Sequence, residues 1–429
     1  MSILFNGVRL LPEYGFGDEE VFAAVDGARY SYIGRERPAG SFAREINAKG
    51  KLLVPGFYNA HCHSAMTLFR GYGEDLPLSR WLEERIFPAE DKLTEKSVYY
   101  GSMLAIAEML RNGIVSFSDM YMFCGATACA VLESGIKANI SRSIVSFDPE
   151  LKKEDDLRFI ESKALYDEFN GAGEGRVKID MALHAEYTNK INTCRYLAEY
   201  AKEKECIVQI HLSETEREHL ECIERNGMTP TEFFLAAGVL DCPVCAAHCV
   251  YVSESDMDIM KEKGVSAVHN PTSNLKLGSG VMPLRAMLDR GINVALGTDG
   301  AASNNTLDLL GELRLASILH KGVTRKADIT SAREMSRLIS QGGARAQRRD
   351  DCGKTEVGQR ADGVLIDMDA PNNIPCYDTY ASLCYSVNSS NVVMTMVDGR
   401  ILFENGEYTS IDKEKLIFEA KDVIKHYFD

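Results

Sequence analysis

The sequence predicts an α/β fold, a (β/α)8 TIM barrel with a small β-sandwich module formed from the N- and C-terminal segments. Two observations lead to this prediction. In the middle of the chain, apolar runs of about six residues alternate with amphipathic stretches of about ten to twenty, the rhythm of a parallel sheet with crossover helices. At both ends, short alternating segments are separated by Gly, Asp and Pro turns and show no helical period.

The terminal segments look like two halves of one module. The N-terminal half contains the alternating stretches ILFNGVRLL, EVFAAVDG and RYSYIGRE, and ADGVLIDMD and VVMTMVDGRILFENG repeat the pattern near the other end. We therefore expect the two ends to pair. This divides the chain into residues 1–55 (first half of the module), 56–350 (barrel with added helices) and 351–429 (second half of the module and a C-terminal helix).

Eight candidate barrel strands lie between these ends, and a helical pattern follows each of them. The strands end at VPGFYNAHCH, IVSFSDM, KANISRSIV, KIDMALHAEY, CIVQIHLSE, PVCAAHCV, VSAVHNP and INVALGTDG. Gly lies at or near several helix ends, as a C-cap requires. After the eighth strand, NTLDLLGELRLASILHKG and SAREMSRLISQGGARAQR predict additional helices, and IDKEKLIFEAKDVIKHYF predicts a terminal amphipathic helix.

Composition excludes several classes of protein. The 429 residues contain no apolar stretch near the roughly 20 residues that a membrane-spanning helix needs. The N-terminus lacks the basic and apolar regions of a signal peptide, so we expect a cytoplasmic protein with no membrane partner. A formal net charge of −15 would repel phosphate backbones, so nucleic acid is not an expected partner. The twelve cysteines follow no disulfide framework.

Histidines and carboxylates lie at the predicted carboxyl ends of the strands, where barrel enzymes place their active residues. His61 and His63 end the first strand, and because alternate residues of an extended chain point the same way, both imidazoles can face one ion. An isolated His is more often a core residue, but five of the nine histidines stand at strand ends here. The sequence therefore predicts a metal site. The other ligand-type residues on this rim are His211, Glu214, His248, His269 and Asp299.

The motifs VPGFYNAHCHSAMTLFRGYGEDLPLSRWL, HLSE, AAHC, HNPTSNLKLGSG and LGTDGAASNN, in that order, resemble those of the amidohydrolase superfamily. The nearest branch is that of the 5-methylthioadenosine/S-adenosylhomocysteine deaminases. The resemblance implies one zinc ion per subunit, with iron as the alternative. The dinuclear relatives use a carboxylated Lys at the end of the fourth strand, where this chain has His184, so no second metal is expected. The implied ligands are His61, His63, His211 and Asp299.

The chemistry implied is the hydrolytic deamination of an adenine nucleoside. A bound zinc-class ion lowers the pKa of water from about 15.7 to about 7, which makes hydroxide available at neutral pH. We expect Glu214 to pass a proton to the ring nitrogen beside the attacked carbon, Asp299 to take the second proton, and His248 to orient the hydroxide. Loss of ammonia completes the reaction.

Substrate contacts follow from the same resemblance. Trp81 and Glu90 match a Trp and a Glu that lie over the nucleoside, and Glu90 would accept hydrogen bonds from the ribose hydroxyls. His184 matches a purine-contacting histidine, although Glu186 replaces the usual Pro two residues later. The other expected substrate-binding residues are Arg142 and Arg158, which match residues that hold the carboxylate of a homocysteine tail, together with Glu214 and His269. Helix packing for Trp81 and a surface salt bridge for Arg158 are the alternatives.

Other functions remain open at this stage. An H-x-E pair followed by C-x-x-C marks nucleobase deaminases of another fold, and His184, Glu186, Cys242 and Cys245 follow that order. That interpretation lacks the Pro before the first Cys and leaves the H-x-H, HLSE and TDG motifs without a role. A deaminase of guanine or cytosine, or an s-triazine aminohydrolase, would use the same metal ligands. A catalytically inactive barrel is disfavoured because every ligand and Glu214 are present. The preferred adenine nucleoside, the native metal and the subunit count, including a homo-oligomer, stay undetermined.

Overall fold

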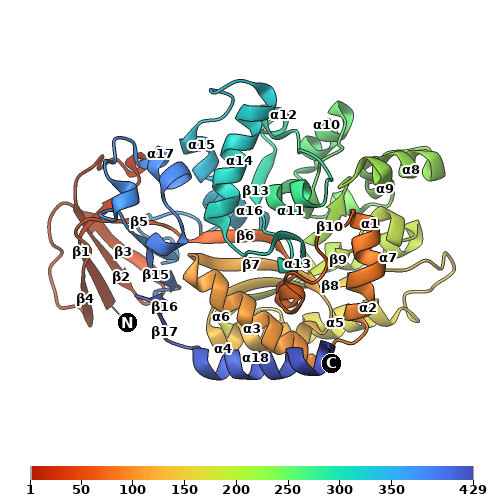
Figure 1. The fold of residues 1–429 in the computed structure, drawn as a ribbon, viewed down its shortest axis with the longest axis horizontal. Coiled ribbons are helices and arrows are strands. Elements are labelled where there is room, and N and C mark those ends of the chain that lie inside the picture. Colours follow the sequence, from red (N-terminus) through yellow and green to blue (C-terminus); the bar gives the residue numbers. More distant parts are fainter. Residues whose placement is uncertain (1, 429) are drawn as a thin grey trace.

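The computed structural model describes residues 2–428. The two ends of the chain form one β-module, which lies on the left in Figure 1. Its nine strands pair in the order β17-β16-β15-β14-β5-β1-β2-β3, and β4 pairs with β1. The first part of β1 pairs with β2 and β4, and its end pairs with β5, so this long strand belongs to both layers of a sandwich. The strands are β1 (Ser2–Leu10), β2 (Val21–Asp26), β3 (Arg29–Gly34), β4 (Arg44–Asn47), β5 (Lys51–Pro55), β14 (Gly363–Asp367), β15 (Val392–Val397), β16 (Arg400–Glu404) and β17 (Glu407–Tyr408).

The alternating sequence pattern explains this packing. Ile3, Phe5 and Val25 from the N-terminal half form one buried apolar cluster with Leu365 and Met396 from the C-terminal half. The central pairing of β5 with β14 is antiparallel and joins residues more than 300 positions apart in the chain. The expectation that the two ends pair is confirmed.

Eight parallel strands form the barrel, in the order β13-β12-β11-β10-β9-β8-β7-β6. Two hydrogen bonds join the first strand to the segment just after the last one, since Asn59 Nδ2 donates to Thr298 Oγ1 (2.7 Å) and Thr298 N donates to Asn59 Oδ1 (3.0 Å). Each strand corresponds to one of the eight predicted segments, so the predicted fold class is correct. The strands are β6 (Phe57–Cys62), β7 (Ile114–Tyr121), β8 (Lys137–Ile144), β9 (Val177–Leu183), β10 (Val208–Leu212), β11 (Val244–His248), β12 (Ser266–His269) and β13 (Asn293–Leu296).

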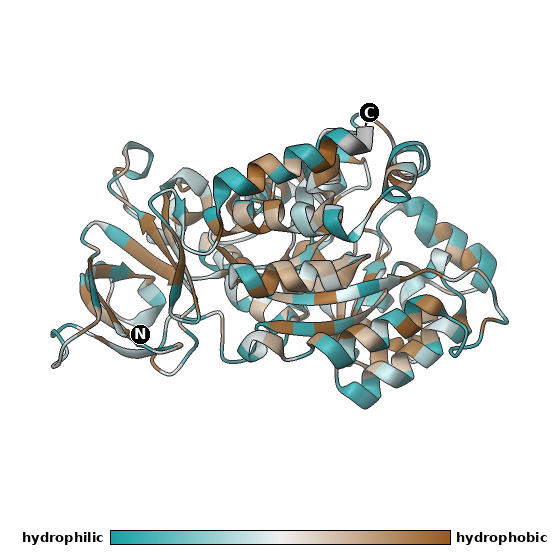
Figure 2. Ribbon diagram, turned by 90° about the horizontal axis from the view of Figure 1, so that it is seen from below, coloured by the Kyte–Doolittle hydropathy of each residue, from teal (hydrophilic) through white to brown (hydrophobic). Residues whose placement is uncertain are grey.

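Helices surround the barrel, and their outer sides carry the hydrophilic residues (Figure 2). The terminal helix α18 packs along α3 on the barrel rather than on the module (Figures 1 and 2). No helix within residues 2–428 is both long enough and apolar enough to cross a membrane. The helices are α1 (Leu78–Trp81), α2 (Phe87–Glu90), α3 (Glu95–Arg111), α4 (Cys124–Ser134), α5 (Leu157–Phe169), α6 (Ala172–Gly175), α7 (Ile191–Lys204), α8 (Glu216–Asn226), α9 (Pro230–Ala236), α10 (Glu254–Lys263), α11 (Pro271–Lys276), α12 (Leu284–Asp289), α13 (Ala301–Asn304), α14 (Leu309–Thr324), α15 (Ala332–Ser336), α16 (Gly343–Ala346), α17 (Thr379–Ala381) and α18 (Lys413–Phe428).

The stretch 331–348, expected as one helical segment, is divided. A π-helical turn at Leu338–Gly342 separates α15 from α16. Gly342 lies against the backbone oxygen of Val294 and Gly343 against that of Tyr58, so a Cβ at either position would collide with a barrel strand. The divided segment therefore passes close to strands β6 and β13.

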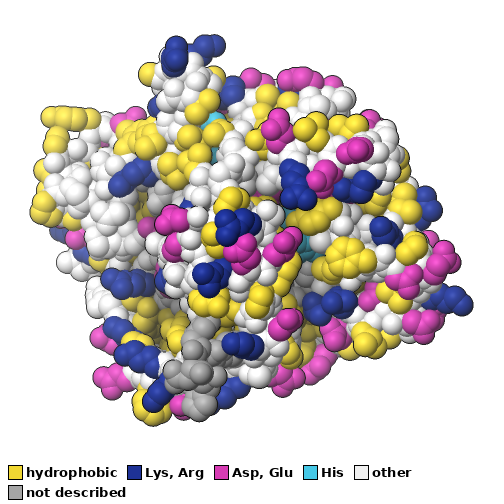
Figure 3. Space-filling view, turned by 45° about the vertical axis from the view of Figure 1, so that its right-hand side comes forward, with side chains coloured by type: hydrophobic (Ala, Val, Ile, Leu, Met, Phe, Trp, Pro, Cys, Tyr) yellow, Lys and Arg dark blue, Asp and Glu magenta, His cyan; other side chains and the backbone are white. Residues whose placement is uncertain are grey.

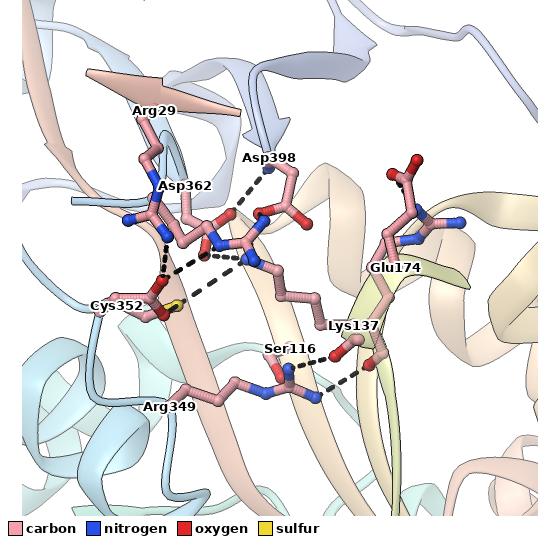
Figure 4. Close-up of polar contacts among 12 residues, drawn as sticks. Arg29, Ser116, Lys137, Glu174, Arg349, Cys352, Asp362 and Asp398 are labelled. Atoms are coloured by element: carbon pink, nitrogen blue, oxygen red, sulfur yellow. Dashed lines mark hydrogen bonds and ion pairs between the residues drawn. The ribbon is translucent and has the colours of Figure 1, made fainter. Parts of the chain in front are cut away.

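A buried ion cluster joins the module to the barrel (Figure 4). Lys137 Nζ, at the start of β8, lies 2.5 Å from Asp362 Oδ2 and 2.8 Å from Asp398 Oδ1, two carboxylates of the module. Tyr58 of β6 donates a further hydrogen bond to Asp362 (2.6 Å). Burial alone would lower the pKa of Lys137, but the charges of Asp362 and Asp398, together with the Cys352 thiol, outweigh that effect and raise the pKa. The two parts of the fold thus share a charged contact closed to solvent.

Candidate metal centre and active site

The predicted metal ligands meet at the carboxyl ends of the barrel strands. His61 and His63 lie at the end of β6, His211 on β10, and Asp299 just after β13. These side chains are largely buried, and histidines appear only as small recessed areas on the face shown in Figure 3. The fold therefore brings residues up to 238 positions apart into one enclosed site (61 to 299).

The ligand atoms of these residues face one another. Asp299 Oδ1 lies 3.2 Å from His63 Nε2 and 3.5 Å from His61 Nε2, and His211 Nε2 lies 3.4 Å from His63 Nε2. His61, His63 and His211 form one group whose ligand atoms all lie within 4.8 Å of one another, and His61, His248 and Asp299 form a second. The buried Nε2 of His61 has no hydrogen-bond partner among the described residues. Neutral imidazoles with one carboxylate are a donor set for a divalent metal ion.

Backbone carbonyls fix the orientation of two of these imidazoles. His63 Nδ1 lies 2.6 Å from the Met120 oxygen, and His211 Nδ1 lies 2.7 Å from the His184 oxygen. Because a carbonyl can only accept, both Nδ1 atoms must carry the proton, and each Nε2 keeps its lone pair for a metal. The tautomers needed for metal binding are therefore set by the strands themselves.

Asp299 divides its two oxygens between different partners. Oδ1 faces the histidines, whereas Oδ2 accepts hydrogen bonds from Ser273 (2.6 Å) and Ser303 (2.9 Å). Burial would raise the pKa of Asp299, but the neighbouring imidazoles of His61, His63 and His248 together outweigh burial and hold the pKa well below its usual value. Before the reaction the carboxylate is therefore ionised and presents one oxygen to the metal position.

Glu214 and His248 stand beside this group. His248 Nε2 lies 3.8 Å from Glu214 Oε2, and Ser279 donates to Glu214 Oε1 (3.3 Å). His248 Nδ1 lies 2.8 Å from Asn274 Oδ1, which makes Nδ1 the donor and leaves Nε2 as an acceptor. Burial raises the pKa of Glu214. A carboxyl group with a raised pKa is suited to accept and return a proton.

Two of the expected substrate residues lie close to the metal group. The His184 ring centroid is 4.9 Å from that of His211, and burial, followed by the charges of the neighbouring histidines, lowers the pKa of His184 to about 4. Glu90 lies at the end of α2. Burial raises the pKa of Glu90, and a hydrogen bond from Tyr121 and the charge of His63 lower it by less. Glu186 is buried and paired with Arg225 (2.6 Å).

The other four expected substrate contacts have partners within the fold, and Trp81 and His269 are considered first. Trp81 is 5% exposed and packs in an apolar cluster with Phe69 and Ile86, which is the packing alternative. His269 points to the outer side of β12, where its Nε2 lies 3.1 Å from His320 Nε2, because the preceding Val268 faces the barrel interior. The structure therefore does not bring His269 to the metal position.

Both arginines are engaged by the chain itself. Arg142 is paired with Glu161 of α5 (2.7 Å) and also donates to the Ser143 oxygen, and exposed Arg158 donates to the Val145 oxygen (3.1 Å).

The cysteine alternative also lacks support, because Cys242 Sγ contacts the Ala198 oxygen, whereas Cys245 Sγ contacts the Ala60 oxygen. These two thiols thus bond to different parts of the fold.

Several supporting residues were missed by sequence reasoning. Ser273, Asn274, Ser279 and Ser303 touch Asp299, His248 or Glu214. They lie within the HNPTSNLKLGSG and TDGAASNN motifs, so their closeness to the ligands in sequence was the available signal.

We expect His211→Ala to weaken binding of the metal by at least about 100-fold, since loss of an outer partner of a ligand alone costs about 10–100-fold. Metal content after dialysis against a weak chelator measures this. The matched control is His269→Gln, which should retain metal because His269 faces away from the site. Equal metal loss in both variants would contradict this assignment of the ligands.

Comparison with known proteins agrees with this geometry. The sequence model of the amidohydrolase family matches residues 52–402. A 5-methylthioadenosine/S-adenosylhomocysteine deaminase of Acetivibrio thermocellus is 42% identical over 383 residues, which cover 89% of this chain and 88% of that protein. A 5'-deoxyadenosine deaminase of Methanosarcina mazei is 42% identical over 376 residues, which cover 88% and 86%. Among solved structures, an adenosine deaminase from Xanthomonas campestris with bound zinc has a TM-score of 0.93 at 31% identity and covers 99% of this chain and 98% of its own.

Proposed function

The chain belongs to the amidohydrolase family, and from that premise we propose that it hydrolyses the exocyclic amino group of an adenine nucleoside, releasing ammonia and the inosine analogue. 5-Methylthioadenosine, S-adenosylhomocysteine and adenosine are the candidate substrates. The observation that carries the proposal is the buried carboxyl of Glu214 beside the His and Asp ligand group. Relatives at 42% identity over most of their length are deaminases of such nucleosides.

The donor set supports one zinc ion, with iron as the alternative. His61, His63, His211 and Asp299 would hold it, and the unpartnered Nε2 of His61 fits this role. When bound, such an ion lowers the pKa of water to about 7 and so supplies a nucleophile at neutral pH. A second ion would need a carboxylated Lys as a bridging ligand. Lys178 lies at the start of β9, where its Nζ donates to the Arg348 oxygen, so it cannot act as that ligand.

The proton transfers are assigned to three residues. Glu214 takes a proton from the attacking water and delivers it to the ring nitrogen next to the attacked carbon. His248, whose Nε2 is an acceptor, orients the water for attack. Asp299 takes the second proton, which leaves with the amino group as ammonia. We assign Glu90 to the ribose hydroxyls and His184 to the purine, on the basis of their places beside the ligand group.

Ammonia release tests the proposal. Zinc-loaded protein is incubated with adenosine, 5-methylthioadenosine, S-adenosylhomocysteine, guanine, cytosine and an amino-s-triazine. We expect turnover of at least one adenine nucleoside and its loss on metal removal with a chelator. Turnover of a free base or triazine alone would replace the substrate assignment with the second candidate function, a base or triazine aminohydrolase on the same scaffold.

A further inference from the structure

The helix that follows β10 carries a buried carboxylate with no part in the proton transfers above. Glu218, in the first turn of α8, is 6% exposed and lies one helical turn beyond Glu214. Its two carboxylate oxygens accept separate hydrogen bonds, Oε1 from Ser213 N (2.9 Å) and Oε2 from Glu214 N (2.7 Å). One side chain thus binds the backbone of Glu214 and of the residue before it.

These two amides have no partner in regular secondary structure. They lie between the end of β10 and the start of α8, where Ser213 has a φ of +48° and the chain turns sharply. A residue other than glycine with φ above zero has a strained backbone unless its surroundings hold it. The Ser213 oxygen is fixed from the other side, because it accepts from Val250 N (3.1 Å) and Tyr251 N (2.9 Å). Hydrogen bonds therefore hold this turn from both sides.

Glu218 itself is held rigidly. Its backbone N donates to Thr215 Oγ1 (3.1 Å), the N-cap of α8. In an ordinary capping box the third helical residue returns a bond to the N-cap backbone. Here the Glu218 carboxylate reaches further back, to the two residues before the cap. The geometry of the catalytic turn is thus set by the first turn of α8.

This arrangement is costly for the fold. Within the described chain, no Lys, Arg or His side chain forms an ion pair with Glu218. Burial, with the nearby charge of Glu214, raises the pKa of Glu218 to about 7. A buried carboxyl without a cation destabilises a protein unless its hydrogen bonds compensate. Because this carboxylate is bonded to the backbone of the active-site residue Glu214, its burial indicates a role in function.

We propose that Glu218 is a positioning residue, which holds the Ser213–Glu214 backbone so that the Glu214 carboxyl faces His248 and the metal position. The inference rests on the proposed role of Glu214 as the proton carrier. A misplacement of about 1 Å in a reacting group can cost about 100-fold in rate. Loss of the two hydrogen bonds is therefore expected to affect turnover more than binding.

Glu218→Gln tests this directly, because its amide can accept from one backbone N–H but turns a donor toward the other. We expect kcat to fall about 10- to 100-fold, with KM within about twofold of wild type and metal content unchanged. Hydrogen exchange at the amides of Ser213 and Glu214 should quicken at least about tenfold. The matched control is Glu221→Gln on the same helix, where the Glu221 side chain is half-exposed and pairs with Arg217 and Arg225. The Glu221→Gln variant should change neither kcat nor the exchange rates of these two amides.

Two outcomes would overturn the proposal. One is unchanged kcat and unchanged exchange in Glu218→Gln. The other is that both Glu218→Gln and the shorter Glu218→Asp lose activity only because they lose zinc or unfold at the assay temperature. Glu218 would then stabilise the fold without positioning Glu214. Exchange needs no substrate. If the wild-type protein deaminates no adenine nucleoside, the proposed function fails while the exchange measurement still tests whether Glu218 holds the turn.

Discussion

Glu214→Gln is expected to lower kcat for the preferred adenine nucleoside by about 10²- to 10⁴-fold, the usual contribution of a general acid–base group. The Gln side chain nearly matches the shape of Glu and can still accept from Ser279, but it cannot take a proton from water and pass it to the ring. Metal content should stay at the wild-type level, because Glu214 is outside the ligand group. Steady-state ammonia release and metal analysis on one preparation measure both effects.

The control for this result is Glu216→Gln, two residues further along the chain. Glu216 is exposed in the first turn of α8, so removing its charge should leave kcat within about twofold. If Glu214→Gln were as active as this control, another group would have to carry the proton, and His248 would be the next candidate.

Much of the fold could be predicted because its main features are periodic. The eight apolar runs, each followed by an amphipathic stretch, specified the barrel strands, and the carboxyl end of each run specified where a catalytic side chain had to lie. This placed His61, His63, His211 and Asp299 on one rim with Glu214, His248 and His269, and the resemblance to the amidohydrolase superfamily selected those four as the expected ligands. Their meeting follows from strand order, which sequence patterns define well.

The direction of single side chains was harder to predict. His269 ends a strand as His248 does, yet a shift of one residue in a strand moves a side chain to the opposite face. Val268 occupies the inward position, and His269 points to α14. Contacts such as that of Arg142 with Glu161 depend on how a helix packs against a strand, which periodicity does not specify.

The supporting polar contacts were the least predictable. Ser273, Ser303 and Asn274 are residue types that are common in loops, and only the folded geometry shows that they bind Asp299 and His248. Glu218 reads in sequence as an ordinary first-turn acid of α8. Its bonds to two backbone amides depend on the positive φ of Ser213, which no sequence pattern revealed.

Lys137→Met is expected to lower the free energy of unfolding by about 3–5 kcal/mol, the usual cost of removing one partner from a buried ion pair. Lys137 is 3% exposed and is paired with both Asp362 and Asp398. Without the ammonium group, two carboxylates of the β-module would remain buried close to each other. Among the residues that the structure describes, the Asp362 carboxylate would keep only its bonds from Tyr58 and from the Asp398 backbone. Urea unfolding of metal-loaded protein measures the change.

The comparison that isolates burial is Lys96→Met. Lys96 also lies near two carboxylates, Glu419 and Asp422 of α18, but its side chain is 57% exposed. Solvent screens such a pair, so its removal should leave the unfolding midpoint unchanged. Because Lys137 lies at the start of β8 and the active site at the other end of the strands, Lys137→Met should also keep its kcat below the unfolding transition. Equal stability losses in the two variants would show that the charges at the junction of module and barrel do not stabilise the fold through burial.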